Sequence, residues 1–248
     1  MNIIILGGGC YGAQYAHRLL QAHERGKIDL DCLEIIDQNA SCKASKDFHD
    51  QAVRVSVSDW TQFLINYIKN SPPKTSDMIV PSHAAPHLLG QTFLELIKSP
   101  HSPLLQRGVR GDFQSVKVEM AEISHPVGTP FEQRLVRGVV AVSMATWKCP
   151  ANCVEPCTCP HLHKPREWNL EELLKKWARK YDVDAFHVFP AHHFAYAVSA
   201  IPVQKIIDAW MSLKPLLKRQ GTYLIGIATT SACHGIVSLM KVPVTGES

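Results

Sequence analysis

One short segment, KCPANCVEPCTCPHLHKPREW at residues 148–168, carries the densest set of chemically active side chains in the chain. Its possible metal ligands are Cys149, Cys153, Cys157, Cys159, His161 and His163. Thiolates with at most one imidazole suit zinc or an iron–sulfur cluster, whereas magnesium and calcium prefer oxygen ligands. Prolines stiffen the segment and reduce the entropy lost when ligands converge on a metal. The segment therefore predicts a metal centre.

The spacing of these cysteines leaves the type of centre open. The pattern C-x3-C-x3-C-x-C is neither the double C-x2-C of a zinc ribbon nor the C-x2-C-x2-C-x3-C-P run of a bacterial ferredoxin. The Cys-Pro pairs at 149–150 and 159–160 favour an iron–sulfur cluster slightly, and zinc stays open. Without a metal, Cys157 and Cys159 could instead form a C-x-C thiol redox pair. A purely structural loop is the third alternative.

Two predicted strands of the second half end in residues that could complete this centre. DAFHVFPA (184–191) leads to His192 and His193, and TYLIGIATT (222–230) leads to Cys233 and His234. If the strands are parallel, these ends share one edge of a sheet. We therefore predict Cys233 as a further metal ligand, with His234 as the alternative ligand, and His192 and His234 as candidate catalytic histidines. A plain turn with a buried thiol is the alternative for Cys233.

The chain begins with a second chemical pattern, NIIILGGGCYGAQYAHRLL, in which a strand leads through glycines into a helix. Gly7, Gly9 and Gly12 satisfy G-x-G-x-x-G, which places a pyrophosphate at a helix N-terminus. The next predicted strand ends in Asp37, where a carboxylate can hold ribose hydroxyls. The predicted cofactor-binding residues are Gly7, Gly9, Cys10, Tyr11, Gly12 and Asp37. Asp37 favours NAD, while Lys43 and Lys46 keep NADP open.

Strands and helices alternate after this loop, which predicts a doubly wound parallel sheet. The pieces IIILGGGCYGAQYAHRL, EIID, VRVSVSD and DMIVP resemble the NAD-binding domain of potassium-uptake regulators and the N-terminal half of saccharopine-dehydrogenase-like reductases. The resemblance covers about the first hundred residues and implies a Rossmann-like fold and a dinucleotide cofactor. It implies no substrate, because the second half does not share it.

A composition shift near Pro103 predicts two domains. Residues 1–103 are expected to form the Rossmann-like domain, and residues 104–248 a second α/β domain that carries the cysteine segment. This second domain is expected to contain β-structure in 114–123 and 137–147, helices in 169–181 and 202–220, and strands in 184–191, 222–230 and 235–242.

After the predicted fourth strand, PSHAAPHLLG places His83 and His87 at the carboxyl edge of the sheet. Ligands bind at this edge in such folds, so both are candidate catalytic histidines. Pro86 favours the first helical position, which leaves His83 in the preceding loop. Packing near the helix start is an equally good interpretation.

The charge and the apolar runs of the sequence argue against two classes of partner, nucleic acids and membranes. The net charge of +4 is dispersed, with no dense basic surface for nucleic acid. No apolar run reaches the length of a membrane span, and no leader precedes the first strand, so we expect a cytoplasmic protein. Its eight cysteines are then expected to be thiols, metal ligands or redox centres. The expected partners are a small-molecule substrate or a redox partner protein, and a homo-oligomer stays open.

Together these patterns predict a cytosolic NAD(P)-dependent oxidoreductase with a Cys/His-ligated zinc or iron–sulfur centre in its second domain. The alternative is a regulatory module that senses the dinucleotide or the redox state of the cysteines. A protein that handles a metal or cofactor during maturation is a third hypothesis.

Overall fold

The computed structural model describes residues 1–48, 53–72, 75–82, 85–98, 118–149 and 153–244. In these residues the chain is a mixed α/β protein that divides into two compact units. Unit 1 comprises Met1–Pro86, Cys149–Arg166 and Ala191–Ile207, and unit 2 comprises His87–Lys148, Glu167–Pro190 and Asp208–Ser248. The predicted boundary at Pro103 lies outside the described residues. Each unit takes segments from both halves of the sequence, whereas the sequence predicts two consecutive domains.

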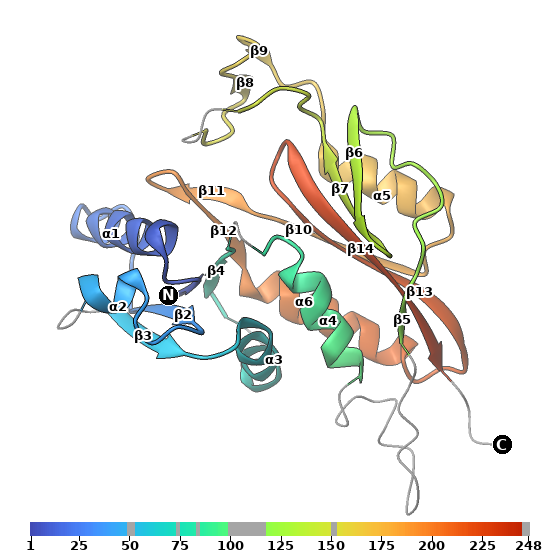
Figure 1. The fold of residues 1–248 in the computed structure, drawn as a ribbon, viewed down its shortest axis with the longest axis horizontal. Helices are drawn as coiled ribbons and strands as arrows, with labels where there is room; N and C mark the ends of the chain where they lie inside the picture. The colour runs from blue at the N-terminus through green and yellow to red at the C-terminus, as the bar shows by residue number, and fades with distance from the viewer. Residues whose placement is uncertain (49–52, 73–74, 83–84, 99–117, 150–152, 245–248) are drawn as a thin grey trace, which may run out of the picture. The chain divides into compact units, whose positions relative to one another are not determined.

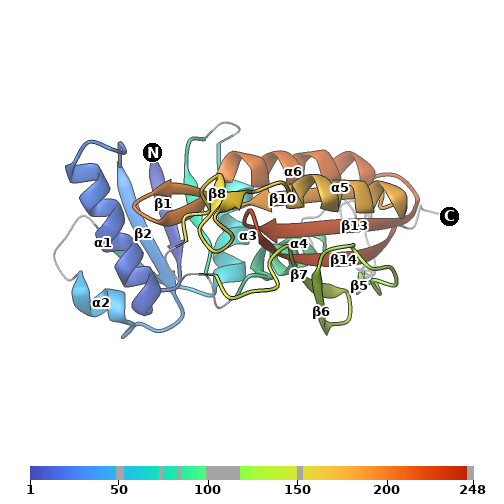
Figure 2. The same cartoon turned by 90° about the horizontal axis from the view of Figure 1, so that it is seen from above.

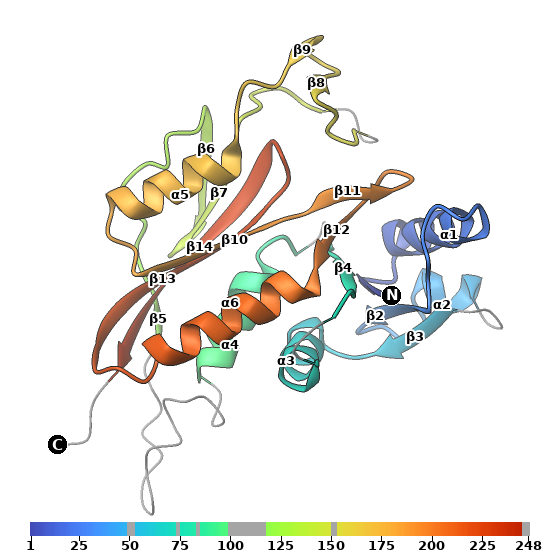
Figure 3. The same ribbon diagram turned by 180° about the vertical axis from the view of Figure 1, so that it is seen from behind.

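Unit 1 is built on a six-stranded sheet with the order β11-β12-β4-β1-β2-β3. Strands β4, β1, β2 and β3 are parallel, and the antiparallel hairpin β11–β12 adds to the edge of β4 (Figure 3). The elements of unit 1 are β1 (Asn2–Leu6), α1 (Cys10–Glu24), β2 (Cys32–Asp37), α2 (Lys43–Asp47), β3 (Val53–Val57), α3 (Trp60–Asn70), β4 (Met78–Val80), β8 (Thr158–Cys159), β9 (Lys164–Pro165), β11 (His192–Ala195) and β12 (Val198–Pro202).

The core of unit 1 lies between α1 and the sheet. The central strand β1 buries Ile3 to Leu6 without alternation, because both of its faces are covered. Helix α1 turns a face of mostly small residues inward: Gly12, Ala13, Ala16, Leu19 and Ala22. Ala195, Val198 and Ala200 from the β11–β12 hairpin join the same apolar cluster. This packing explains why residues near 200 belong to the unit that begins at residue 1.

Unit 2 is built on a six-stranded sheet. Five of its strands follow the order β10-β13-β14-β7-β6, and the sixth, β5, pairs with β14. Strands β10 and β13 are parallel and the other pairs are antiparallel; β13 and β14 form a long hairpin (Figure 2). The elements are α4 (Leu88–Lys98), β5 (Glu119–Met120), β6 (Phe131–Val136), β7 (Val139–Ser143), α5 (Leu170–Lys180), β10 (Ala185–Pro190), β13 (Gly221–Thr230) and β14 (His234–Val244). Helix α6 (Val203–Leu216) begins in unit 1, and its residues from Asp208 onward belong to unit 2.

The sheet of unit 2 is covered on both faces, by α5 on one side and α4 on the other (Figure 1). Side chains alternate along a strand, so Val237 and Leu239 of β14 pack in the cluster that contains α5. Ser238, between them, lies against α4, where a Cβ added to Gly90 would be 2.3 Å from its Oγ. A glycine at position 90 thus lets α4 approach the sheet closely.

No helix in the described part of the chain is both long and apolar enough to cross a membrane.

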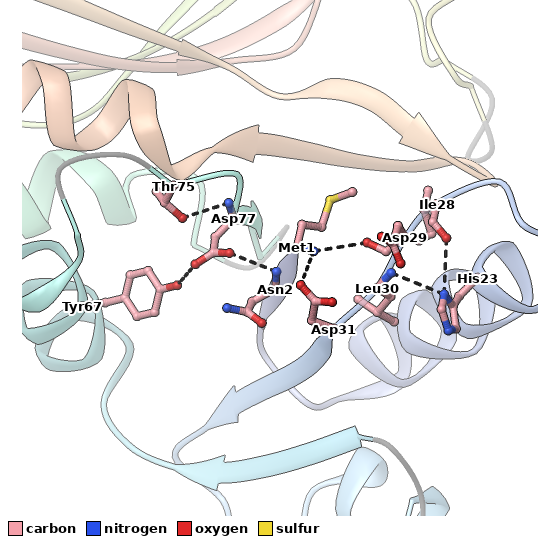
Figure 4. A network of polar contacts seen from close by, with 10 residues as sticks. All are labelled: Met1, Asn2, His23, Ile28, Asp29, Leu30, Asp31, Tyr67, Thr75 and Asp77. Carbon is pink, nitrogen blue, oxygen red and sulfur yellow. Dashed lines mark hydrogen bonds and ion pairs between the residues drawn. The ribbon is translucent and has the colours of Figure 1, made fainter.

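A polar network ties the start of β1 to the start of β4 (Figure 4). The Asp77 carboxylate accepts hydrogen bonds from the Tyr67 hydroxyl and, at 2.9 Å, from the Asn2 amide. Burial acts to raise the pKa of Asp77, but the hydrogen bonds from Tyr67 and Asn2 outweigh it, and the pKa lies below its ordinary value of 3.8. In the same figure the Met1 amino group contacts the Asp31 carboxylate at 2.6 Å.

We expect Asp77→Asn to lower the free energy of unfolding at neutral pH and to reduce its dependence on acid. Because the folded-state pKa is depressed, the contribution of Asp77 is complete well above pH 3.8 and is lost as the pH falls through the folded-state pKa. Urea unfolding followed between neutral pH and about pH 3 measures this difference. The exposed Glu24→Gln is the control, and an equal loss of acid dependence in both variants would contradict the assignment.

Candidate functional site

The turn from β1 into α1 has a backbone that requires glycine at two points. Gly7 has a φ of +100°, in the region that residues with side chains rarely adopt, and its amide donates to the Ile36 carbonyl at 2.8 Å. At Gly12 an added Cβ would lie 1.8 Å from the carbonyl oxygen of Gly7. The first turn of α1 is therefore packed directly against the end of β1.

Gly9 has the opposite environment. An added Cβ there would meet no atom within 4 Å, so open space lies beside this part of the turn. Gly9 precedes α1 as its N-cap residue, no side chain caps the helix, and its first turn holds no acidic residue. A helix N-terminus carries partial positive charge and amide donors. The predicted residues Cys10 and Tyr11 are the first two of this helix, and both are exposed.

Asp37, at the end of β2, is held beside the same turn. Its carboxylate accepts from the Gly8 amide at 2.6 Å and from the Asn39 amide at 2.8 Å. These two bonds use one lone pair on each oxygen, which leaves the carboxylate further acceptor capacity. The structure thus brings together Gly7, Gly9, Gly12 and Asp37, which lie as far as 30 residues apart in the sequence.

Three residues that the sequence analysis does not select also surround the glycines. Trp60 and Ser82 lie 3.4 and 3.5 Å from the position of a Cβ on Gly7, and the Trp60 indole donates to the Ile36 carbonyl. Cys42 packs so closely on Gly8 that an added Cβ would be 2.5 Å from its sulfur. No local signal marks them, because each comes from a different βα connection.

Lys43 and Lys46 are the two lysines that could bind the 2′-phosphate of NADP, and Lys43 already contacts a carboxylate. It forms an ion pair with Asp47 at 2.9 Å, one turn further along α2. The hydrogen bond and charge of Asp47 raise the pKa of Lys43 above its ordinary value. The Asp47 carboxylate thus neutralises part of the positive charge that would attract a 2′-phosphate.

The predicted catalytic histidines lie in different parts of the fold. His83 is outside the described residues. His87 is exposed in unit 2, and its carbonyl accepts from the Gln91 amide at the start of α4. His192 is exposed at the start of β11 in unit 1, where the chain has already left β10. His193 follows it and accepts from the Ala197 amide at 3.2 Å.

The cysteine segment folds as a small hairpin, β8–β9, drawn in yellow in Figure 1. Cys159 is buried, Cys157 is exposed, and Cys149 and Cys153 are partly buried. All eight cysteines are thiols rather than disulfides. Among the described residues, no three His, Cys, Asp or Glu side chains converge as a metal-binding group. The predicted ligand Cys233 belongs to unit 2, whereas Cys149 to Cys159 belong to unit 1.

In unit 2, Cys233 and His234 stand where β14 begins. Cys233 is buried and its carbonyl accepts from the Met144 amide, while His234 is exposed. The Nδ1 atom of His234 lies 2.9 Å from the Oγ atom of Ser143, the residue opposite it on β7. Ser143 has no signal in the sequence that links it to His234, because the two residues are 91 positions apart.

The contacts of Ser143 fix the proton on the histidine. Its hydroxyl donates to the Ala145 carbonyl at 2.7 Å and accepts from the Ala145 amide at 2.9 Å. A hydroxyl has one hydrogen to donate and two lone pairs. The His234 Nδ1 atom must therefore carry the hydrogen that it shares with Ser143, which makes Nε2 the basic nitrogen of the neutral ring.

We expect Ser143→Ala to lower the free energy of unfolding by about 1–3 kcal/mol, because it leaves the polar groups of buried Ala145 without their partner. Ser212→Ala, at an exposed serine of the same unit that also donates to a carbonyl, should cost less. Urea unfolding compares the two, and nitrogen NMR shifts of His234 report its tautomer. Equal losses, or a wild-type ring protonated on Nε2, would contradict this description.

Comparison with known proteins concerns mainly the second half of the chain. Residues 101–243 match the model of a family described as "Uncharacterized protein, C-terminal domain". This match includes β5 to β13 and most of β14 but leaves out the glycine turn. No curated protein and no solved structure matches the chain.

Proposed function

We propose that this chain, which belongs to the family described as "Uncharacterized protein, C-terminal domain", binds NAD(H) at the turn between β1 and α1 and acts as an oxidoreductase on a small-molecule substrate. The main support for this proposal is the structure of the β1–α1 turn. It combines two positions that admit only glycine, open space at Gly9 and an uncapped helix N-terminus. When bound, the nicotinamide would supply or accept a hydride.

The turn fits a pyrophosphate. Backbone amides can approach a phosphate only where no side chain intervenes, and Gly9 provides such an opening. The first turn of α1 contains no carboxylate that would repel the phosphate charges. The partial positive charge of the helix end then favours the anion.

Asp37 fits the ribose of the adenosine half. Its bond from the Gly8 amide places the carboxylate within one residue of Gly9, where the pyrophosphate would bind. Its remaining lone pairs can accept from ribose hydroxyls, whereas its negative charge would repel a 2′-phosphate. Together with the Lys43–Asp47 pair, this favours NAD over NADP.

The strand order supports the same conclusion. In unit 1 the parallel strands run β3-β2-β1-β4, which matches the first four strands of the Rossmann order 3-2-1-4-5-6. The order reverses between β1 and β4, and ligands of open α/β sheets bind at the carboxyl ends of the strands at such a point. Gly7 follows β1 there, and Ser82 follows β4.

We expect Gly9→Ala to weaken NADH binding at least about tenfold, or about 1.4 kcal/mol, without lowering stability. The new methyl group enters open space in the protein, and Gly9 has an ordinary φ of −69°, but it would occupy the approach to the phosphates. Quenching of tryptophan fluorescence, with Trp60 beside the turn, can follow the titration.

Gln14→Ala, exposed on the next turn of α1, serves as the binding control, and Gly12→Ala serves as the folding control. Gln14→Ala should bind like the wild type, and Gly12→Ala should disrupt the fold of unit 1. Unchanged NADH affinity in a folded Gly9→Ala variant, or no binding by the wild type, would refute the proposed site. A wild type that prefers NADPH would refute the role given to Asp37.

A further inference from the structure

The segment Cys149–Arg166 has almost no apolar core of its own. Among its described residues only Cys159 is buried, at 5% exposure, and its largest aliphatic side chain, Leu162, is exposed. Its strands β8 and β9 have two residues each. A hairpin this short is not stable in water by itself. Small segments without a core are usually held by a metal or by disulfides, and these cysteines are thiols.

One backbone amide points at the sulfur of Cys153. The Glu155 amide donates to the Cys153 Sγ atom at 3.4 Å. Glu155 has a φ of +53°, a left-handed conformation that residues other than glycine adopt at a cost. The thiolate is the form of cysteine that binds metals.

Cys157 and Cys159 are fixed by a second set of backbone bonds. The Cys157 carbonyl accepts from the Arg166 amide, and the Cys159 carbonyl accepts from the His163 amide, both at 2.8 Å. His163 is also left-handed, with a φ of +53°. Two residues of the hairpin, Glu155 and His163, thus adopt a left-handed conformation next to the cysteines, while little apolar surface is buried.

Arg166 places buried guanidinium donors in the hairpin. Its Nη2 atom donates to the Glu155 carbonyl at 2.6 Å. Its Nε and Nη1 atoms are buried and have no hydrogen-bond partner within the described structure. Buried donors of a charged group are costly unless an anion compensates them. Four thiolates around a divalent ion carry a net negative charge that would do so.

We propose that Cys149, Cys153, Cys157 and Cys159 bind one zinc ion as a closed structural site, independently of the dinucleotide. The intervals Cys149-x3-Cys153 and Cys153-x3-Cys157 fall within the C-x2–4-C spacing of structural zinc sites. The ion replaces the thiol protons, which are released to solvent, and no electron is transferred. We expect the ion to stabilise the fold of the hairpin, because binding to a structural zinc site contributes folding free energy.

Zinc suits this hairpin better than an iron–sulfur cluster. The cysteine spacing does not match a ferredoxin run, and Cys157 is exposed to solvent. Zinc is not redox-active, so exposure of a ligand to solvent does not affect its oxidation state, and it binds four thiolates in a tetrahedral arrangement. Cys233 is not needed in this ligand set. The site therefore differs from the centre predicted from the sequence, which Cys233 or His234 would complete.

The test is the metal content of the full-length protein, purified without oxygen and chelators, with iron and acid-labile sulfide measured on the same sample. We expect about one zinc per chain in the wild type and in Cys32→Ser, whose cysteine lies outside the hairpin. Cys153→Ser and Cys159→Ser should lose most of the zinc. Iron with sulfide, no metal in the wild type, or full zinc content in Cys153→Ser would each overturn the proposal.

A second measurement needs no variant and so does not depend on the variants folding. Cobalt added to chelator-treated wild-type protein should give the absorption bands of a tetrahedral thiolate site. Removal of the metal should also speed cleavage by trypsin after Lys148 and Arg166, at the two ends of the hairpin. Cobalt spectra without thiolate bands, or cleavage that does not depend on metal, would overturn the proposal.

Discussion

The candidate cofactor site depends on a steric constraint between Gly7 and Gly12. The first turn of α1 lies so close to the end of β1 that any side chain at position 12 would overlap the Gly7 carbonyl. This contact directs the helix N-terminus, with its amides, toward the carboxyl edge of the parallel strands. The bond from the Gly8 amide to Asp37 then couples the turn to the end of β2. The phosphate site and the ribose acceptor that we propose would thus depend on the same few backbone contacts.

The units distribute their polar groups differently. In unit 1 the polar groups around the glycine turn include backbone amides and the Asp37 carboxylate, which would suit an anionic cofactor with hydroxyl groups. In unit 2 the corresponding feature is the Ser143–His234 pair at the start of β14, where a buried hydroxyl sets the tautomer of an exposed ring. The cysteine hairpin is a third kind of structure, in which backbone bonds present sulfur atoms and little apolar surface is buried.

Local patterns in the sequence predict the elements with a strong periodic or turn signal. The glycine turn, Asp37 and helix α5 are of this kind; α5 begins where the Asn169 side chain caps it and buries Leu170, Leu174 and Trp177 on one face. Strands β10 and β13 are parallel, as the assignment of their ends to one edge requires. Strand β6 was not predicted, because its side chains are nearly all exposed and show no alternation. The addition of β11–β12 to the edge of β4 also has no local signal, since it joins residues 79 and 201.

The central claim is that the β1–α1 turn receives the pyrophosphate of NAD(H), and amide NMR of the wild-type protein titrated with NADH tests it most directly. We expect the amide resonances of Gly9 and Cys10 to shift strongly and in a saturable way, while those of the β8–β9 hairpin stay in place. If NADH leaves the resonances of Gly9 and Cys10 unchanged, or shifts only residues outside unit 1, the β1–α1 turn does not bind the dinucleotide.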